Sequence, residues 1–313
     1  MDDIVGKDGM EKVLEDYLRG QDGTRAIETT TSGKVTNVLS SKNPILGKNC
    51  VLTLDIRLQE AAEKSLAAIV PKLREEGKTN SRWGGEDAKG ASLVVLDVRN
   101  GDALAMASYP SFSLKDYKKN YNDLLHDPLR PMTNRAISGL YPPGSTFKMV
   151  SSIAGLESGT ITKNTKIEDL GVYRYYAPSY TPMCDVYKTY HRTHGYVNVE
   201  EALQVSCNYF FYEVGRLMGI DTLADYAKRL GFGQKTGIEI PGESTGQVAS
   251  PELKAEKGEI WYPGQTIAAA IGQSDTLVTP LQLANYVSTL CNGGVRYQPH
   301  LLKSCLLYTS RCV

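Results

Sequence analysis

The sequence predicts an α/β (α+β) sandwich, in which strands early in the chain precede a mainly helical middle part. Two observations carry this prediction. Residues 91–98 form an apolar, β-prone run before an Asn-Gly turn, and several segments after residue 140 have apolar residues at helical spacing. At 313 residues with 41% apolar content, the chain is long enough to bury a sizeable core.

The first main-domain elements are expected to be a helix and a hairpin. Apolar residues recur at helical spacing over residues 58–70, and Pro71 is expected to stop that helix. Residues 91–98 then lead into Asn100-Gly101, a strong hairpin turn signal, and residues 103–108 return as the partner strand.

Helices are predicted to dominate the rest of the chain. One begins near Ser145, and others cover residues 198–218, 222–230 and 280–291. Asn198 with Glu201 fits a capping box, and Thr279 precedes a proline at a first helical position. The remaining strands of the sandwich are expected late in the chain.

Three regions are predicted. Residues 1–47 contain a short amphipathic stretch and a Gly/Thr/Ser-rich run, and they have too few apolar residues to fold alone. They are interpreted as the remnant of an accessory region. Residues 48–304 form the main domain, and residues 305–313 form a separate tail.

The net charge does not predict binding to nucleic acid or to an anionic membrane. Lys plus Arg and Asp plus Glu number 35 each, so no global field attracts the chain to nucleic acid or to an anionic membrane. Nowhere do 18 apolar residues run together, and the first residues lack a signal-peptide pattern. The chain as given reads as soluble, which leaves open an anchor removed upstream.

The six cysteines are scattered without a CxxC pair and are interpreted as free thiols or core residues. The best metal candidates are Cys184, His191 and His194, because these residue types ligate zinc. Their spacing fits no standard site, so the interpretation as loop residues is preferred, and neither a metal nor an organic cofactor is expected.

Ser145 and Lys148 are three residues apart, so on a helix they share a face. A serine hydroxyl needs a neighbouring base to act as a nucleophile, and a desolvated lysine can be neutral enough to serve. The helix start at Ser145 also offers backbone N–H groups to an oxyanion. The tetrapeptide Ser-x-x-Lys is common, however, and needs a second element.

That second element is Ser206-Cys207-Asn208, expected inside a helical run. A hydroxyl beside a carboxamide can relay a proton to a leaving amine and hold a substrate amide. Taken alone, this tripeptide is better explained as a pair of polar residues on a helix surface or at a helix junction.

Together the two elements resemble the active-site motifs of penicillin-binding proteins and serine β-lactamases. Within that superfamily the chain is similar to the monofunctional class B proteins of the cell-elongation type. The supporting stretches are residues 6–12, 52–59, 141–148, 231–243, 271–273 and 278–284. The resemblance implies that Ser145 is the nucleophile, Lys148 the general base, and Ser206 and Asn208 the second motif.

The implied activity is peptidoglycan D,D-transpeptidation through an acyl-enzyme on Ser145, with stem peptides as substrates and β-lactams as inhibitors. The resemblance also implies a membrane-anchored, extracytoplasmic parent protein and a glycan-polymerising partner. The alternatives are a serine β-lactamase, for which no group that activates a deacylating water is identified, and a non-catalytic penicillin-binding fragment.

The third motif of the family, Lys-Thr-Gly, is expected to be missing. Residues 235–237 have this sequence, but Pro241 lies four residues later and would interrupt an edge strand. They are therefore interpreted as a structural decoy. In the family the catalytic copy follows the stretch that begins at Thr279, so the chain is expected to be truncated before it and impaired as a catalyst. Residues 305–313 are interpreted as an unrelated reading frame.

Overall fold

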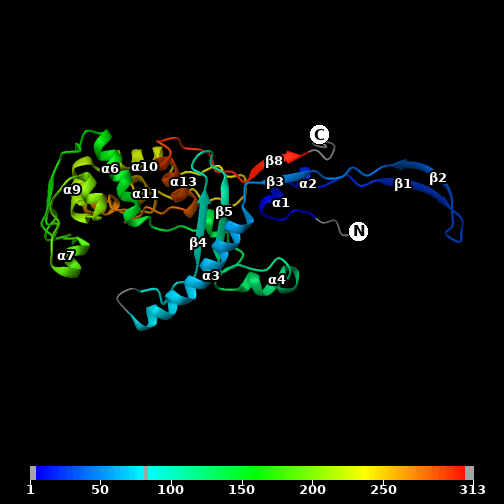
Figure 1. Cartoon of the computed structure of the whole chain (residues 1–313), viewed down its shortest axis with the longest axis horizontal. Helices are drawn as coiled ribbons and strands as arrows, with labels where there is room; N and C mark the ends of the chain where they lie inside the picture. The colour runs from blue at the N-terminus through cyan, green and yellow to red at the C-terminus, as the bar shows by residue number, and fades with distance from the viewer. Residues whose placement is uncertain (1–4, 81–83, 307–313) are drawn as a thin grey trace.

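The structure, a computed structural model, describes residues 5–80 and 84–306. It is elongated, with a helical body at one end and a thin two-stranded arm at the other (Figure 1). Helix α3 (Ile56–Thr79) and the hairpin β4–β5 lie between them. The fold therefore separates the segment before residue 47 from the part that contains Ser145.

Residues 5–52 form two short helices and three strands. They are α1 (Gly9–Val13), α2 (Glu15–Leu18), β1 (Thr24–Thr29), β2 (Val35–Lys42) and β3 (Asn49–Leu52). Strands β1 and β2 pair antiparallel, and every residue in both is exposed. Strand β3 pairs with β8 (Leu302–Leu306) near the other end of the described chain. Sequence reasoning did not predict these strands, because the segment lacks an alternating apolar pattern.

The predicted hairpin is confirmed. Strands β4 (Ala91–Leu96) and β5 (Ala103–Tyr109) pair antiparallel, with Val94 opposite Met106. Gly101 has φ of +86°, a conformation that its lack of a side chain allows in the turn. Alternate residues of β5 are buried, so one face of the hairpin covers α3.

The predicted stop at Pro71 is wrong, because α3 continues through it to Thr79. Proline removes one backbone hydrogen bond, but tertiary contacts beyond it hold the last two turns. Gly77 is buried and lies against the backbone of residues 84–86. The guanidinium of Arg74 donates to the carbonyl of Ala88.

The remaining elements are mostly helices, as predicted. They are α4 (Tyr117–His126), α5 (Arg135–Ser138), the 3-10 turn η1 (Gly144–Phe147), α6 (Lys148–Glu157), β6 (Ile167–Asp169), α7 (Asp185–Tyr190), β7 (Gly195–Val197), α8 (Val199–Gln204), α9 (Asn208–Met218), α10 (Ile220–Arg229), α11 (Pro251–Glu256), α12 (Pro263–Ala269) and α13 (Pro280–Cys291). The predicted capping box at Asn198 and the predicted cap at Thr279 are both present, and Thr279 also forms a capping box, with Gln282.

Two apolar clusters flank α6 and α9. In the first, the ring of Phe232 packs between those of Phe147 and Tyr286 at tilted angles, with centroids 5.7 and 5.0 Å away. In the second, Phe210 and Phe211 of α9 are fully buried. Burial of such rings is the main stabilisation of the helical body and gives the side chains on α6 and α9 a rigid support.

Among residues 5–80 and 84–306, none of the helices combines the length and the apolar character needed to cross a bilayer. Of the strands expected late in the chain, the described part contains β8. The predicted tail at residues 305–313 is not tested, and residues 307–313 lie outside the described residues. The proposed division at residues 47 and 304 stays a prediction.

Candidate active site

The backbone around Ser145 is fixed by two glycines. Gly144 has φ of +57° and donates its N–H to the carbonyl of Gly272 at 2.9 Å. A Cβ atom on Gly272 would lie 2.1 Å from the carbonyl oxygen of Gly144, so only glycine permits this approach. Ser145 follows in η1 and is exposed, with its hydroxyl accessible to a substrate.

The predicted continuous helix over residues 198–218 is wrong, because the chain breaks between α8 and α9. Ser206 lies in the break with φ of +52°, a conformation that costs a non-glycine residue about 1–3 kcal/mol. The N–H of Cys207 compensates in part by donating to the carbonyl of Ala202 at 2.9 Å. The break brings Ser206 and Asn208 to the ammonium group of Lys148.

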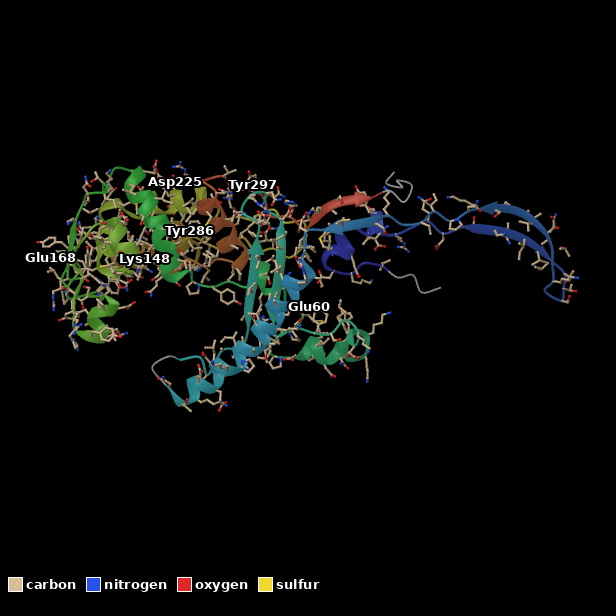
Figure 2. The ribbon with its side chains drawn as sticks, in the orientation of Figure 1. Glu60, Lys148, Glu168, Asp225, Tyr286 and Tyr297 are labelled. Carbon is tan, nitrogen blue, oxygen red and sulfur yellow. The ribbon has the colours of Figure 1, made fainter. Side chains whose placement is uncertain are left out.

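Lys148 is the first residue of α6 and is only 1% exposed. Its Nζ donates to three oxygens: the carbonyl of Ser206 at 2.7 Å, the hydroxyl of Ser206 at 2.9 Å and Oδ1 of Asn208 at 2.6 Å. Figure 2 shows Lys148 inside the helical body. Sequence reasoning placed these three residues in one site, and the structure joins them directly.

The hydroxyl of Ser206 also donates to Oγ of Ser145 at 3.2 Å. Ser206 therefore bridges the nucleophile candidate and the lysine. Burial lowers the pKa of Lys148 to about 8, against the opposing influence of the nearby Cys184 and Cys207 thiols. A substantial neutral fraction near neutral pH suits this lysine to accept a proton from serine.

Residues 235–237 form no strand, in agreement with their interpretation as a decoy. The carboxylate of Glu243 accepts the N–H and the hydroxyl of Thr236 at 2.7 and 2.6 Å and the N–H of Gly237 at 3.2 Å. The Gly237 carbonyl accepts from the side chain of Gln298. These bonds give the tripeptide a turn-stabilising role.

Four potential metal ligands meet beside the second motif. The ligand atoms of Asp169, Cys184, His194 and Cys207 all lie within 4.8 Å of one another. Both thiols are at most 1% exposed, and Asp169 is 2% exposed. Oδ2 of Asp169 is 2.8 Å from Nδ1 of His194 and 3.7 Å from the Cys207 sulfur. Four ligands of S, N and O type match the usual coordination of structural zinc.

Two of the three metal candidates from the sequence, Cys184 and His194, are in this cluster. His191 is not; its ring packs edge-on against Tyr187. Sequence reasoning missed Asp169 and Cys207, since nothing local relates residues this far apart. A hydrogen bond from Cys207 lowers the pKa of Cys184 to about 6, while the same bond raises the pKa of Cys207. Low thiol pKa favours metal binding.

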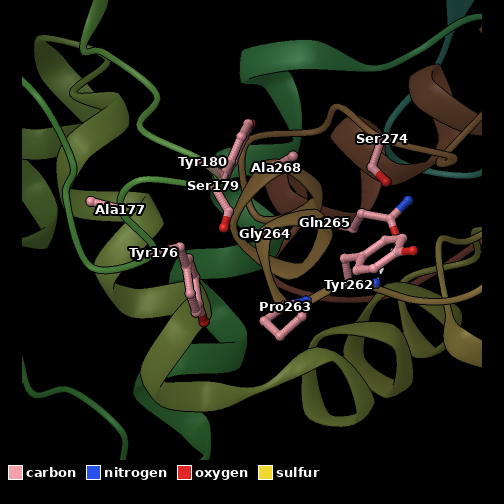
Figure 3. A pocket seen from close by; sticks show the side chains of 10 residues that line it. All are labelled: Tyr176, Ala177, Ser179, Tyr180, Tyr262, Pro263, Gly264, Gln265, Ala268 and Ser274. Carbon is pink, nitrogen blue, oxygen red and sulfur yellow. Dashed lines mark hydrogen bonds between the residues drawn. The ribbon is translucent and has the colours of Figure 1, made fainter.

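A cavity of about 640 Å³ opens between the segment around Tyr176–Tyr180 and the start of α12 (Figure 3). Tyr176 and Tyr180 face Tyr262 across it, and Ser274 lies at one side. Ser145 does not line this cavity, but Ser274 follows Gly272, the contact partner of Gly144, by two residues.

Comparison with known families identifies the class of protein. The model of the penicillin-binding protein transpeptidase domain matches residues 91–309, and that of the penicillin-binding protein dimerisation domain matches residues 1–52. The chain belongs to the penicillin-binding protein transpeptidase family. The predicted resemblance and the predicted fold class are thereby confirmed.

Curated relatives show which members of this family the chain resembles. The chain is 33% identical to peptidoglycan D,D-transpeptidase MrdA of Acinetobacter baumannii and 35% identical to MrdA of Escherichia coli K12. It is 32% identical to penicillin-binding protein 2A of Bacillus subtilis. Each match covers 96% of this chain but only 42%, 44% and 40% of the respective relative. The chain thus spans less than half the length of these relatives.

Solved structures that resemble the chain belong to the same kind of protein. One of these structures is titled "Structural coordination of polymerization and crosslinking by a peptidoglycan synthase complex". The chain is 36% identical to a protein in that structure, with a TM-score of 0.84. The match covers 96% of this chain and 52% of that one. For Pseudomonas aeruginosa PBP2 in complex with WCK 5153, the identity is 32%, the TM-score 0.75 and the coverage 96% and 60%. For Helicobacter pylori PBP2 bound to MreC, these values are 29%, 0.78, 96% and 52%.

Proposed function

We propose that this chain carries the serine nucleophile and proton relay of a peptidoglycan D,D-transpeptidase. The observation that supports it most is the continuous set of hydrogen bonds from Ser145 through Ser206 to the buried Lys148. A serine, a second hydroxyl and a lysine with lowered pKa form the apparatus for acyl transfer through a covalent intermediate.

Lys148 first loses one proton to solvent, and the Ser206 hydroxyl turns so that it donates to Lys148 Nζ and accepts from Ser145. Lys148 then takes the Ser206 proton while Ser206 takes the proton of Ser145. The Ser145 oxygen attacks the carbonyl carbon of the D-Ala-D-Ala amide. The relay then returns the proton to the amide nitrogen, the C–N bond breaks, and D-alanine leaves. An amine of a second stem peptide attacks the ester, loses a proton to the relay, and regenerates Ser145. Asn208 holds Lys148 through its Oδ1 atom throughout.

Two similar structures support a proposal about the partners and location of this chain. One similar structure describes a complex that couples polymerization to crosslinking, and another contains a PBP2 bound to MreC. We infer that this chain functions at the extracytoplasmic face of the cell membrane, beside a glycan-polymerising partner, and that β-lactams acylate it by imitating the D-Ala-D-Ala end.

Labelling with a fluorescent penicillin tests this function. Peptide mass spectrometry is expected to place the adduct on Ser145, and Ser145→Ala is expected to remove at least about 99.9% of the labelling. Ser244→Ala is the control, because Ser244 lies outside the relay. An adduct that persists in Ser145→Ala would refute the assignment of the nucleophile.

The two alternatives give different kinetics. A serine β-lactamase releases hydrolysed penicillin with turnover, and a non-catalytic penicillin-binding fragment is labelled but does not consume a D-Ala-D-Ala-like thioester. The transpeptidase function predicts slow release of penicillin together with amine-dependent thioester consumption. Rapid penicillin turnover would favour the β-lactamase.

Separately, we propose that Asp169, Cys184, His194 and Cys207 hold a structural zinc ion. Cys207 lies between Ser206 and Asn208, so such a site would stabilise the break that presents both residues to Lys148. Zinc-loaded protein is expected to retain about one equivalent after dialysis, and Cys207→Ser is expected to retain far less. Cys291→Ser, at an exposed thiol, is the control. Equal zinc contents in all three proteins would contradict the site.

A further inference from the structure

The cavity between Tyr176, Tyr180 and Tyr262 has walls of aromatic rings (Figure 3). The backbone pairs Tyr176 with Tyr180, and the ring of Tyr180 packs directly over Gly264, where a Cβ atom would lie 2.8 Å from that ring. At the start of α12, the N–H of Tyr262 donates to Oε1 of Gln265 at 2.9 Å. Glycine at position 264 therefore sets how deeply Tyr180 can lie in the wall.

Charge is absent from the lining. All ten residues around the cavity are described, and none is Asp, Glu, Lys, Arg or His. A carboxylate or ammonium group entering it would lose hydration without an opposite charge, which is unfavourable. The polar groups present are tyrosine and serine hydroxyls and the Gln265 amide. Such a lining suits a neutral ligand that has both C–H faces and hydroxyl groups.

The cavity volume of about 640 Å³ is within the range of sites that bind a ligand of drug size. This is enough room for more than one sugar ring. Tyrosine rings present flat apolar faces and a hydroxyl at the edge, which matches the alternation of C–H and O–H groups on a pyranose.

A short stretch of backbone connects the cavity to the region of Ser145. Gly272 contacts Gly144, which precedes Ser145, and the Cα atoms of Gly272 and Ser274 are separated by at most roughly 7 Å. Ser274 has φ of +67°, a strained conformation for serine that places it at the cavity. Strain of this kind is retained where the residue has a role that glycine does not fill.

We propose that this cavity binds an uncharged N-acetylhexosamine stretch of the glycan strand whose stem peptide reacts at Ser145. The proposal rests on the proposed transpeptidase function and adds to it a glycan subsite. The charged ends of the stem peptide are excluded from this subsite by its uncharged lining.

The test uses tetra-N-acetylchitotetraose, a neutral N-acetylglucosamine oligomer without peptide. Its binding to the full chain is measured by saturation-transfer NMR and calorimetry. Tyr180→Ala is expected to weaken binding about tenfold, the loss that follows from removing one aromatic contact. Tyr190→Ala, a 65% exposed tyrosine outside the cavity, is expected to bind like the unaltered protein. No detectable binding, or equal weakening by both variants, would overturn the proposal.

The Ser274→Gly variant distinguishes a role of Ser274 in sugar binding from a role in folding. If Ser274 has only a structural role, glycine relieves the positive φ, raises the melting temperature and leaves sugar binding unchanged. The proposal instead expects a higher melting temperature together with weaker binding, about threefold or more, because one hydroxyl partner is lost. Labelling of the unaltered protein by a fluorescent penicillin is recorded in the same samples. Labelling without sugar binding refutes the subsite alone, and sugar binding without labelling refutes the proposed function alone.

Discussion

The β1–β2 arm and the helix α9 are stabilised in different ways. Every residue of β1 and β2 is exposed, and the pair is held by backbone hydrogen bonds. Seven of the eleven residues of α9 are buried, including the rings of Phe210 and Phe211. A two-stranded ribbon without an apolar face is marginally stable by itself. The side chains predicted to be catalytic are on the part that burial makes rigid.

The contrast shows where sequence changes are tolerated. Along the arm, apolar side chains such as Leu39, 60% exposed, contribute little to folding but remain available to a partner. In the body, the buried ring of Phe211 lies beside Lys148, with Nζ 5.6 Å from the ring centre. Stability and catalysis are therefore coupled in the body and separate from the arm.

The largest expected effect is the loss of stability caused by Phe211→Ala. The Phe211 ring is fully buried, and Nζ of Lys148 lies 5.6 Å from its centre. Its loss is expected to reduce the free energy of unfolding by about 3–5 kcal/mol, measured by urea denaturation. Leu217→Ala, at a 49% exposed position of the same helix, is the control. Similar losses in both variants would remove the distinction between the faces of α9.

The next effect is the pH dependence of acylation. With the pKa of Lys148 lowered to about 8, the rate of penicillin acylation is expected to rise about tenfold per pH unit below 8 and then level off. Quenched samples analysed by mass spectrometry measure this rate. A rate that is constant between pH 6 and 9 would exclude Lys148 as the base.

The same shift affects stability. Because the pKa of Lys148 is lower in the folded protein than its ordinary value of 10.5, the unfolded state binds more protons between about pH 8 and 10.5. The contribution of Lys148 to stability therefore increases as the pH rises through this range. The difference between the unaltered protein and Lys148→Met in urea denaturation isolates it, and an opposite slope would contradict the lowered pKa.

A smaller effect is expected at the cap of α8. Oδ1 of Asn198 accepts the N–H of Glu201 at 2.9 Å, and the Glu201 carboxylate accepts the N–H of Asn198 at 2.8 Å. Asn198→Ala is expected to cost about 1 kcal/mol of unfolding free energy, whereas Asn198→Asp keeps the acceptor and most of the stability. Equal losses in the two variants would show that the cap bond is not what stabilises α8.

The smallest effect is expected in the arm. Leu39→Ala is expected to change the free energy of unfolding by less than about 0.5 kcal/mol, because its side chain is already largely in water. A loss above about 1 kcal/mol in the same urea titration would show that the arm packs against the body in solution.

Local signals predicted the body better than the arm. The Asn100-Gly101 turn and the caps at Asn198 and Thr279 each depend on a few neighbouring residues, and all three are present. The predicted stop at Pro71 was wrong because the contact of Gly77 with the backbone of residues 84–86 outweighs the local preference of proline.

The candidate site was predicted in its residues but not in its geometry. Spacing and resemblance pointed to Ser145, Lys148, Ser206 and Asn208, and hydrogen bonds connect all four. The helix break at Ser206 was not predicted, since the apolar pattern continues through it. Their catalytic roles stay predictions until the acylation experiments are done.

The contact between Gly144 and Gly272 has a consequence for drug resistance. A side chain at position 272 would collide with the backbone that carries the nucleophile. On the proposed transpeptidase function, variants selected on a β-lactam are therefore expected to retain glycine there, because a side chain would also displace the backbone before Ser145.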